Sequence, residues 1–214
     1  MSNPLFSFDR GQDVQYVCGA DEAGRACWAG PLVAAAVRFD YDRVDANTVA
    51  RLEHLNDCKK VTPLRRAALL PVILEVADVA AIVVIPAAQI DREGLDVSNM
   101  RALGQALEAV AVAGSVNLVD WFDLQGAGAS ARRVVDGDRT SAAIAAASIV
   151  AKETHDQLMR ALDREHSGYG FAEHKGYGTP AHAAAIRDLG RLSPAHRLSV
   201  HAKAYAAIGV FPTA

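Results

Sequence analysis

The chain has little cysteine, no long hydrophobic run and no recognisable leader segment. Its 214 residues include 3 cysteines, at positions 18, 27 and 58, and they form no C-x-x-C pair. This spacing argues against a disulfide framework and a structural zinc site, and it suits a reducing compartment. The longest apolar run, residues 79–88, is far shorter than the ~18 residues that a membrane helix needs. The first ten residues lack the basic and apolar regions of a secretory signal. We therefore expect a soluble, cytoplasmic protein that does not bind membranes.

Hydrophobic residues, by contrast, are plentiful: they make up 51% of the chain, and charged residues make up 22%. This composition excludes a disordered or fibrous protein, and the length predicts one large domain or two small ones. The formal net charge of -3 predicts no general attraction to polyanions. The charge is uneven, because Lys and Arg outnumber Asp and Glu only in residues 160–214. An acidic catalytic half beside a basic, phosphate-binding half would give this asymmetry, and so would ordinary surface scatter.

Apolar runs and turn residues predict an α/β fold with a mixed sheet. Short apolar runs indicate strands at residues 16–21, 32–39, 79–85, 117–122 and 134–135. Caps and helical spacing indicate helices at residues 62–77, 98–114, 140–164 and 179–190. Ser98 is the expected cap of the second helix, and Pro71 is expected to kink or divide the first. The nearly unbroken alanines at residues 142–147 would let the third helix lie close against the sheet.

Carboxylates stand at the ends of three of these strands. Asp21 and Glu22 end the first strand, Asp120 lies near the end of the fourth, and Asp138 follows the fifth. A cluster of such groups raises its own pKa values unless a cation neutralises it. Oxygen ligands without neighbouring cysteine or histidine favour Mg²⁺ or Mn²⁺ over zinc. Two such ions ~4 Å apart support in-line phosphoryl displacement, so the hypothesis is phosphodiester hydrolysis. Scattered surface acids are the alternative that spacing alone leaves open.

Other sequence features point to no further cofactor. Residues 126–128 read Gly-Ala-Gly without the rest of a dinucleotide fingerprint, and no phosphate-binding G-x-x-x-x-G-K motif occurs. Five of the 7 histidines lie after residue 165, and none is paired at the spacing of a helical metal site. We interpret these histidines as nucleic-acid contacts or surface caps.

Several blocks of the sequence resemble, in order, those of the type 2 ribonucleases H. The first block is Gly19-Ala20-Asp21-Glu22-Ala23-Gly24-Arg25, followed by the apolar segment 29–37. The remaining blocks are residues 55–60, 137–138 with 144–152, 169–171, 174–179 and 196–199. The resemblance implies an RNase H-like mixed five-stranded sheet flanked by helices, with a C-terminal helical extension. It also implies a catalytic domain over residues 1–160 and a helical substrate-binding subdomain over residues 161–214.

The resemblance implies an activity as well. Members of this family are metal-dependent endoribonucleases that use two divalent cations, Mg²⁺ or Mn²⁺. They cut on the 5′ side of a ribonucleotide in a DNA duplex, and the RNA of RNA/DNA hybrids, leaving a 3′-hydroxyl and a 5′-phosphate. The positions that match the family's catalytic and metal-binding carboxylates are Asp21, Glu22, Asp120 and Asp138. Those that match its substrate-binding residues are Gly24, Arg25, Ala26, Lys59, Ser148, Lys175 and Tyr177.

The family gives each substrate-binding position a role. The Gly24-Arg25-Ala26 loop would read the ribose 2′-hydroxyl, which is the group that distinguishes RNA from DNA at a single nucleotide. Tyr177 would pack near the sugar of the next deoxynucleotide. Lys59, Lys175 and the basic C-terminal part would hold backbone phosphates.

The chain departs from the family pattern mostly at substrate-side positions. Ala26 replaces the last glycine of the loop, and Cys58 replaces a serine. Trp121 replaces a glycine, and Asp136 stands where lysine is common. No expected metal ligand is replaced, so we expect catalysis to survive with altered affinity or junction preference.

Two other functions fit these residues less well. A non-catalytic hybrid-binding protein would have no use for acids beside a phosphate backbone, and a carbohydrate hydrolase could use Asp21 and Glu22 as paired carboxylates. The type 3 ribonucleases H are disfavoured because the first motif begins at residue 19, which leaves no room for their N-terminal substrate-binding domain. We expect a monomer that acts on RNA/DNA hybrids and on DNA containing ribonucleotides.

Overall fold

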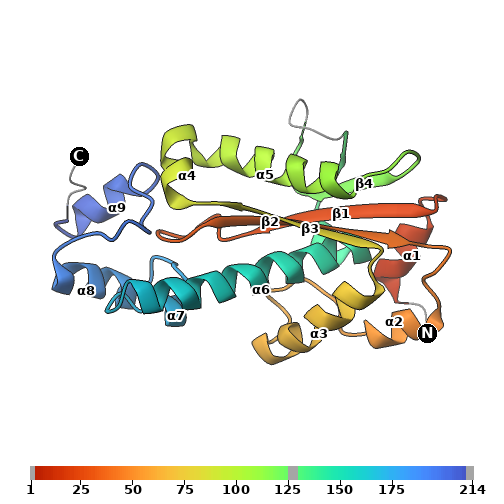
Figure 1. Ribbon diagram of the computed structural model, residues 1–214, viewed down its shortest axis with the longest axis horizontal. Helices are drawn as coiled ribbons and strands as arrows, with labels where there is room; N and C mark the ends of the chain where they lie inside the picture. The colour runs from red at the N-terminus through yellow and green to blue at the C-terminus, as the bar shows by residue number, and fades with distance from the viewer. Residues whose placement is uncertain (1–2, 125–129, 211–214) are drawn as a thin grey trace. The chain divides into compact units, whose positions relative to one another are not determined.

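The computed structural model describes residues 3–124 and 130–210 (Figure 1). The first half contains α1 (Pro4–Arg10), β1 (Tyr16–Ala23), β2 (Leu32–Asp40), α2 (Ala46–Arg51), α3 (Pro63–Val76), β3 (Val79–Ile85), α4 (Ala87–Glu93) and α5 (Leu95–Val110). The second half contains β4 (Val116–Asp120), β5 (Arg132–Val134), the 3-10 helix η1 (Gly137–Arg139), α6 (Ala142–Glu165), α7 (Phe171–His174), α8 (Pro180–Leu189) and α9 (Ala202–Ala207). The predicted α/β class is confirmed.

The strands form one mixed five-stranded sheet in the order β3-β2-β1-β4-β5. Strand β1 runs parallel to β4, with Ala20 opposite Val119, and β4 runs parallel to β5, with Asp120 opposite Val134. The carboxyl ends of these three strands therefore meet at one edge of the sheet, which is where open α/β sheets place their ligands.

The chain divides into two compact units. The first comprises the residues up to 23 together with 34–83 and 100–153, and the second comprises 24–33, 84–99 and the residues from 154 onward. Within the first unit, the part of α5 from residue 100 lies on one face of the sheet, and α3 and the part of α6 up to residue 153 lie on the other (Figure 1). None of the helices in the described part of the chain combines the length and apolar character needed to cross a bilayer.

The start of α6 packs directly on β1. Residues 142–147 are fully buried. A side chain at Gly19 would bring its Cβ within 2.2 Å of the Ile144 backbone nitrogen. The alanine-rich first turns thus let the helix backbone approach the sheet closely, as the sequence predicts.

Three local predictions differ from the structure in whole or in part. Ser98 does not cap a helix, because Gly94, at φ +86°, separates α4 from α5 and the second of these begins at Leu95. Ser98 is instead buried in the helix interior. Pro71 does not divide α3, which is a single helix of 14 residues, so the alternative of a division is wrong and the kink stays a prediction. Pro71 and Ala67 are both exposed, so water can reach the carbonyl that loses its helical partner. The fifth strand ends at Val134 and excludes residue 135.

Candidate active site

Three aspartates from different elements of the first unit come together. Asp21 lies in β1, Asp120 is the last residue of β4, and Asp138 lies in η1, just beyond β5. One carboxylate oxygen from each lies within 4.8 Å of the other two. Asp21 and Asp138 are buried and Asp120 is half-buried. Folding therefore gathers three of the four carboxylates singled out in the sequence.

Glu22 lies beside this group but outside the set of three mutually close carboxylates. Its backbone N–H donates a hydrogen bond to Asp21 Oδ1 at 2.7 Å. Its charge is one of the causes that raise the pKa of Asp21. The side chain of Glu22 is therefore near enough to act on the same site.

A backbone hydrogen bond fixes Asp120 relative to the turn that carries Asp138. The N–H of Gly137 donates to Asp120 Oδ1 at 2.7 Å. A Cβ on Gly137 would lie 2.6 Å from Ile144 Cδ1 and 3.1 Å from that same carboxylate oxygen. Only glycine lets the turn approach both the helix and the carboxylate this closely.

Asp57 is a fourth aspartate at this place, and the sequence predicts no role for it. Its carboxylate is buried, accepts a hydrogen bond from the Lys59 N–H at 2.9 Å, and raises the pKa of Asp138. The available signal was its position directly before Cys58 and Lys59 in one of the family-like blocks. Its proximity to Asp138 is a tertiary contact that the spacing does not reveal.

The carboxylates shift one another's pKa values upward. Burial, with the charges of Glu22 and Asp120, raises the pKa of Asp21 well above 3.8. Burial, with the charges of Asp57 and Asp120, raises the pKa of Asp138 to about 6. Burial also raises the pKa of Asp120. Such a cluster favours a nearby cation, and its all-oxygen donors fit a hard divalent ion.

Lys59 supplies one positive charge to this site. Burial lowers the pKa of its ammonium group, but the nearby carboxylates, Asp57 first among them, outweigh burial and raise it overall. The Lys59 charge in turn lowers the pKa of Asp120. Lys59 therefore stays protonated close to the aspartates, where it can also meet a phosphate.

Ser148 and Cys58 line the interior side of the site. Ser148 is 1% exposed in α6. The Ser148 hydroxyl lies close enough to Asp21 and Cys58 for hydrogen bonding to lower the pKa of both groups. Burial still raises the pKa of the Cys58 thiol to about 11, so this thiol is protonated at neutral pH.

The Gly24-Arg25-Ala26 loop belongs to the second unit. Gly24 has a φ of +83°, and a Cβ there would lie 2.5 Å from the His155 ring. Ala26 is exposed and is not among the described residues with positive φ. The alanine in place of the family's glycine therefore causes no left-handed strain. Arg25 forms an exposed ion pair with Asp96 at 2.7 Å.

Tyr177 and Lys175 lie on a neighbouring segment of the second unit. Cys27 and Tyr177 form an isolated antiparallel bridge, and the N–H of Trp28 donates to Gly176 O at 2.8 Å. The Tyr177 side chain is 39% exposed. The Lys175 ammonium group donates a hydrogen bond to the carbonyl of Ala172. The second unit thus brings the predicted ribose-reading loop next to the predicted sugar-packing tyrosine.

Two of the substituted positions carry backbone strain. Trp121 and Asp136 have φ values of +62° and +51°. This left-handed region costs a side-chain-bearing residue roughly 1–2 kcal/mol. The glycine of the family pattern at position 121 would avoid that cost. The exposed Trp121 ring lies 5.0 Å from the Arg133 guanidinium, and this cation–π contact offsets part of it.

The interpretation of the C-terminal histidines as nucleic-acid contacts or surface caps is wrong for His182 and His196. Their exposures are 0% and 1%, and their Nε2 atoms lie 3.1 Å apart. His182 Nδ1 also contacts the Tyr177 carbonyl at 3.0 Å. Burial lowers the pKa of each ring to about 4, so both are neutral at pH 7.

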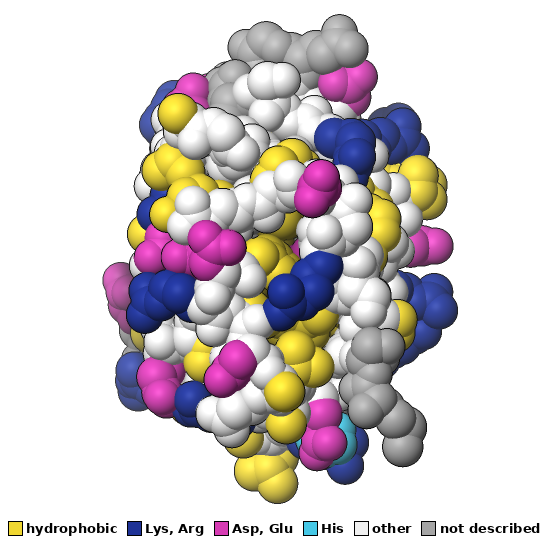
Figure 2. All heavy atoms as spheres, turned by 90° about the vertical axis from the view of Figure 1, so that its right-hand side faces the viewer, with side chains coloured by type: hydrophobic (Ala, Val, Ile, Leu, Met, Phe, Trp, Pro, Cys, Tyr) yellow, Lys and Arg dark blue, Asp and Glu magenta, His cyan; other side chains and the backbone are white. Residues whose placement is uncertain are grey.

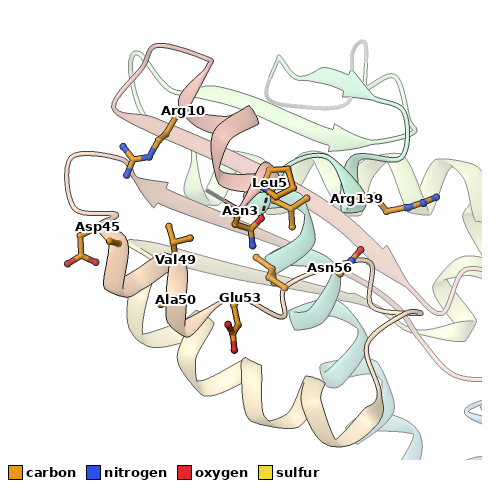
Figure 3. A pocket seen from close by; sticks show the side chains of 12 residues that line it. Asn3, Leu5, Arg10, Asp45, Val49, Ala50, Glu53, Asn56 and Arg139 are labelled. Atoms are coloured by element: carbon orange, nitrogen blue, oxygen red, sulfur yellow. Dashed lines mark hydrogen bonds between the residues drawn. The ribbon is translucent and has the colours of Figure 1, made fainter. Parts of the chain in front are cut away.

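A cavity of about 860 Å³ lies in the first unit, and Figure 3 shows the side chains around it. Asn56 and Arg139, the chain neighbours of Asp57 and Asp138, are part of its wall, but none of the three clustered aspartates is. Arg10, Asp45 and Glu53 add charges of both signs. Basic and acidic side chains are also interspersed on the face that carries α1 and α2 (Figure 2). The described residues of this face therefore form no single-sign patch for a polyanion.

Comparison with known proteins supports one family. The family model described as Ribonuclease HII matches residues 18–203. A Ribonuclease HII from Mycobacterium sp. (strain JLS) is 43% identical over 183 residues, which cover 86% of this chain and 74% of that protein.

Two solved structures have a similar fold. The ribonuclease H2 from Pyrococcus horikoshii superposes with a TM-score of 0.70 at 22% identity, over 86% of this chain and 93% of that one. Bst ribonuclease HIII, solved in complex with Mn²⁺, gives a TM-score of 0.63 at 20% identity, over 86% and 66% of the two chains. The predicted RNase H-like architecture is confirmed. The match to the family model over most of the residues and the identity to its curated members show that the chain belongs to the ribonuclease HII family.

Proposed function

We propose that the chain is a metal-dependent endoribonuclease that cuts on the 5′ side of a ribonucleotide in a DNA duplex and within the RNA of RNA/DNA hybrids. The observation that carries this proposal is the convergence of Asp21, Asp120 and Asp138 from three sheet-edge positions. Acids that raise one another's pKa are unfavourable in a protein that only binds nucleic acid, but they suit a site that holds cations.

Asp21, Asp120 and Asp138, with Glu22 beside them, would hold two Mg²⁺ or Mn²⁺ ions. When bound, such ions activate a water molecule and stabilise the leaving oxygen of a phosphodiester. The Mn²⁺ bound to the structurally similar ribonuclease HIII supports this choice of ion. Lys59 would attract the phosphate, and Asp57 would hold the Lys59 backbone and the Asp138 carboxylate in place.

Substrate selection would fall to the second unit. The backbone of the Gly24-Arg25-Ala26 loop would contact the 2′-hydroxyl, and Tyr177 would pack on the neighbouring deoxyribose. Lys175 and the basic residues after 160 would bind phosphates. The assignment of residues 161–214 as a substrate-binding subdomain, monomeric action and a cytoplasmic location remain predictions.

Cleavage of a labelled DNA duplex that contains one ribonucleotide tests the proposal. We expect a single nick 5′ of the ribonucleotide with Mg²⁺ or Mn²⁺, and no nick with EDTA. Asp21→Asn should abolish nicking, whereas Asp42→Asn, at an exposed aspartate of the same unit, should not. Metal-dependent binding without cleavage would instead support the hybrid-binding alternative, and cleavage that survives EDTA would contradict the proposal.

The Ala26→Gly variant tests the departure in the loop. Ala26 is exposed and unstrained, so we expect the metal dependence to stay the same and only the affinity or junction preference to change. An unchanged rate and an unchanged site preference would show that the extra methyl group has no effect.

A further inference from the structure

Arg197 is a fully buried cation whose guanidinium binds the backbone of residues 25–31, the segment that contains Arg25 of the ribose-reading loop and continues to β2. Its side chain is 0% exposed. Nη1 donates to Arg25 O at 2.9 Å, Nε to Gly30 O at 2.9 Å and Nη2 to Pro31 O at 2.7 Å. One side chain therefore fixes three carbonyls of a loop that is far away in the sequence.

The residues around Arg197 bind the same loop. The Arg197 N–H and the Tyr205 hydroxyl both donate to Trp28 O, at 2.8 and 2.7 Å. His201 Nε2 lies 3.0 Å from Cys27 O, and the Gly30 N–H donates to Ala195 O at 2.8 Å. We call these groups of residues 195–205 the carbonyl clamp. Because the clamp holds the carbonyls of residues 25, 27, 28, 30 and 31, the peptide planes of the loop have fixed directions.

Within residues 3–124 and 130–210, the hydrogen-bond partners of the guanidinium include no carboxylate. Asp91, an acid whose charge acts on Arg197, instead accepts hydrogen bonds from Leu198 N, Ser199 N and Ser199 Oγ at 2.9, 2.9 and 2.7 Å. Burial lowers the pKa of Arg197, but an arginine stays charged in proteins. A buried cation that is hydrogen-bonded only to carbonyls carries a desolvation cost that these hydrogen bonds offset in part. The Arg197 guanidinium therefore places a positive charge against the carbonyl oxygens of residues 25, 30 and 31.

We propose that Arg197 is a positioning residue that sets the enzyme's preference for a ribonucleotide. By holding the loop carbonyls on its own side, it orients the backbone of residues 24–26 toward the 2′-hydroxyl and the adjacent phosphate. This inference rests on the proposed function, because it assigns Arg197 a part in the substrate reading of that same site.

Arg197→Lys tests the proposal because it keeps the charge and loses the planar fork that reaches three carbonyls. Arg92→Lys, at an exposed arginine of the same unit, is the matched control. We would measure kcat and KM on a duplex with one ribonucleotide, and Ki for an all-DNA duplex as a competitor. Arg197→Lys should lower kcat/KM by about tenfold or more, since charge-assisted hydrogen bonds are lost, and should change Ki by less than about twofold. Arg92→Lys should change neither.

Amide hydrogen exchange provides a readout that does not depend on activity. In Arg197→Lys, the amides of residues 25–30 should exchange faster while those of β1 and β4 stay protected. Equal losses in kcat/KM and in all-DNA binding would mean a merely structural role and would overturn the proposal. Faster amide exchange in the loop with an unchanged preference for the ribonucleotide would also overturn the proposal.

A second variant covers the case in which Arg197→Lys does not fold. Tyr205→Phe removes one clamp hydrogen bond, to Trp28 O, and should cause a smaller loss of the same kind. Unchanged exchange and unchanged preference in this variant would also overturn the proposal. If the wild-type protein does not distinguish the two duplexes, the proposed function fails, whereas the exchange result still tests the clamp.

Discussion

The carboxylate cluster should make the metal-free protein less stable than a variant that lacks one of the charges. Asp138 is buried beside Asp57 and Asp120, and its pKa is raised from 3.8 to about 6. At ~1.4 kcal/mol per pKa unit, this shift corresponds to at most ~3 kcal/mol. Because the neighbouring Asp120 is half-buried and admits water, we expect about 1–2 kcal/mol from Asp138→Asn. At ~2–4 °C per kcal/mol, its Tm in EDTA should rise by about 2–8 °C.

The stability that Asp138→Asn gains over the wild-type protein should increase with pH. The folded wild-type protein keeps the Asp138 proton up to about pH 6, whereas the unfolded chain loses it near pH 3.8. The wild-type protein therefore loses stability as the pH rises through this window. Asparagine does not titrate, so the advantage of Asp138→Asn should be greatest above pH 6 and should vanish near pH 4.

Circular dichroism melts in EDTA at pH 4 and pH 7.5 would measure both effects, with Asp42→Asn as the exposed control. Saturating Mg²⁺ should remove the advantage, because the cation offsets the charge that asparagine removes. Nicking activity should be lost throughout. A lower Tm than wild type in EDTA at pH 7.5, or a gain of equal size at both pH values, would refute the reasoning.

Three further perturbations test the packing and the buried charges. Glu153→Gln removes the negative charge that faces the buried Arg66 at 2.8 Å and should cost about 3–5 kcal/mol in urea unfolding, and a loss below about 1 kcal/mol would contradict this. Gly19→Ala places a Cβ 2.2 Å from the Ile144 nitrogen, so the Tm should fall by the equivalent of at least about 1–3 kcal/mol, and an unchanged Tm would be the contrary result. Burial lowers the pKa of His182 and of His196 from 6.5 to about 4, so stability should fall as the pH falls from 6.5 to 4, by up to ~3 kcal/mol per ring. His182→Gln should flatten that slope in acid unfolding, and an unaltered slope would argue against burial as its cause.

The sequence predicted the features that follow from chain order and periodicity. The proximity of Asp21, Asp120 and Asp138 could be predicted because parallel strands place their carboxyl ends at one edge of a sheet. The alanines of α6 likewise indicated a close approach to β1. The start of α5 could not be predicted from Ser98, because a glycine with positive φ at position 94 determines where that helix begins.

Tertiary contacts account for what the sequence did not show. Asp57 acts on Asp138 across 81 positions of chain, and no local pattern marks that pairing. His182 and His196 look like surface residues in a basic segment, yet each has its polar contacts inside the fold. Arg197 lies in one of the family-like blocks, 196–199, but only the folded chain shows that it binds backbone carbonyls.

The position of bound Mn²⁺ tests the proposed catalytic site most directly. Crystals grown with Mn²⁺ would locate the ions through anomalous scattering, for the wild-type protein and for Asp21→Asn. We expect two peaks coordinated by Asp21, Glu22, Asp120 and Asp138 in the wild type, and loss of at least one peak in the variant. Saturated crystals with no peak among these carboxylates, or with the same peaks after Asp21→Asn, would contradict the assignment.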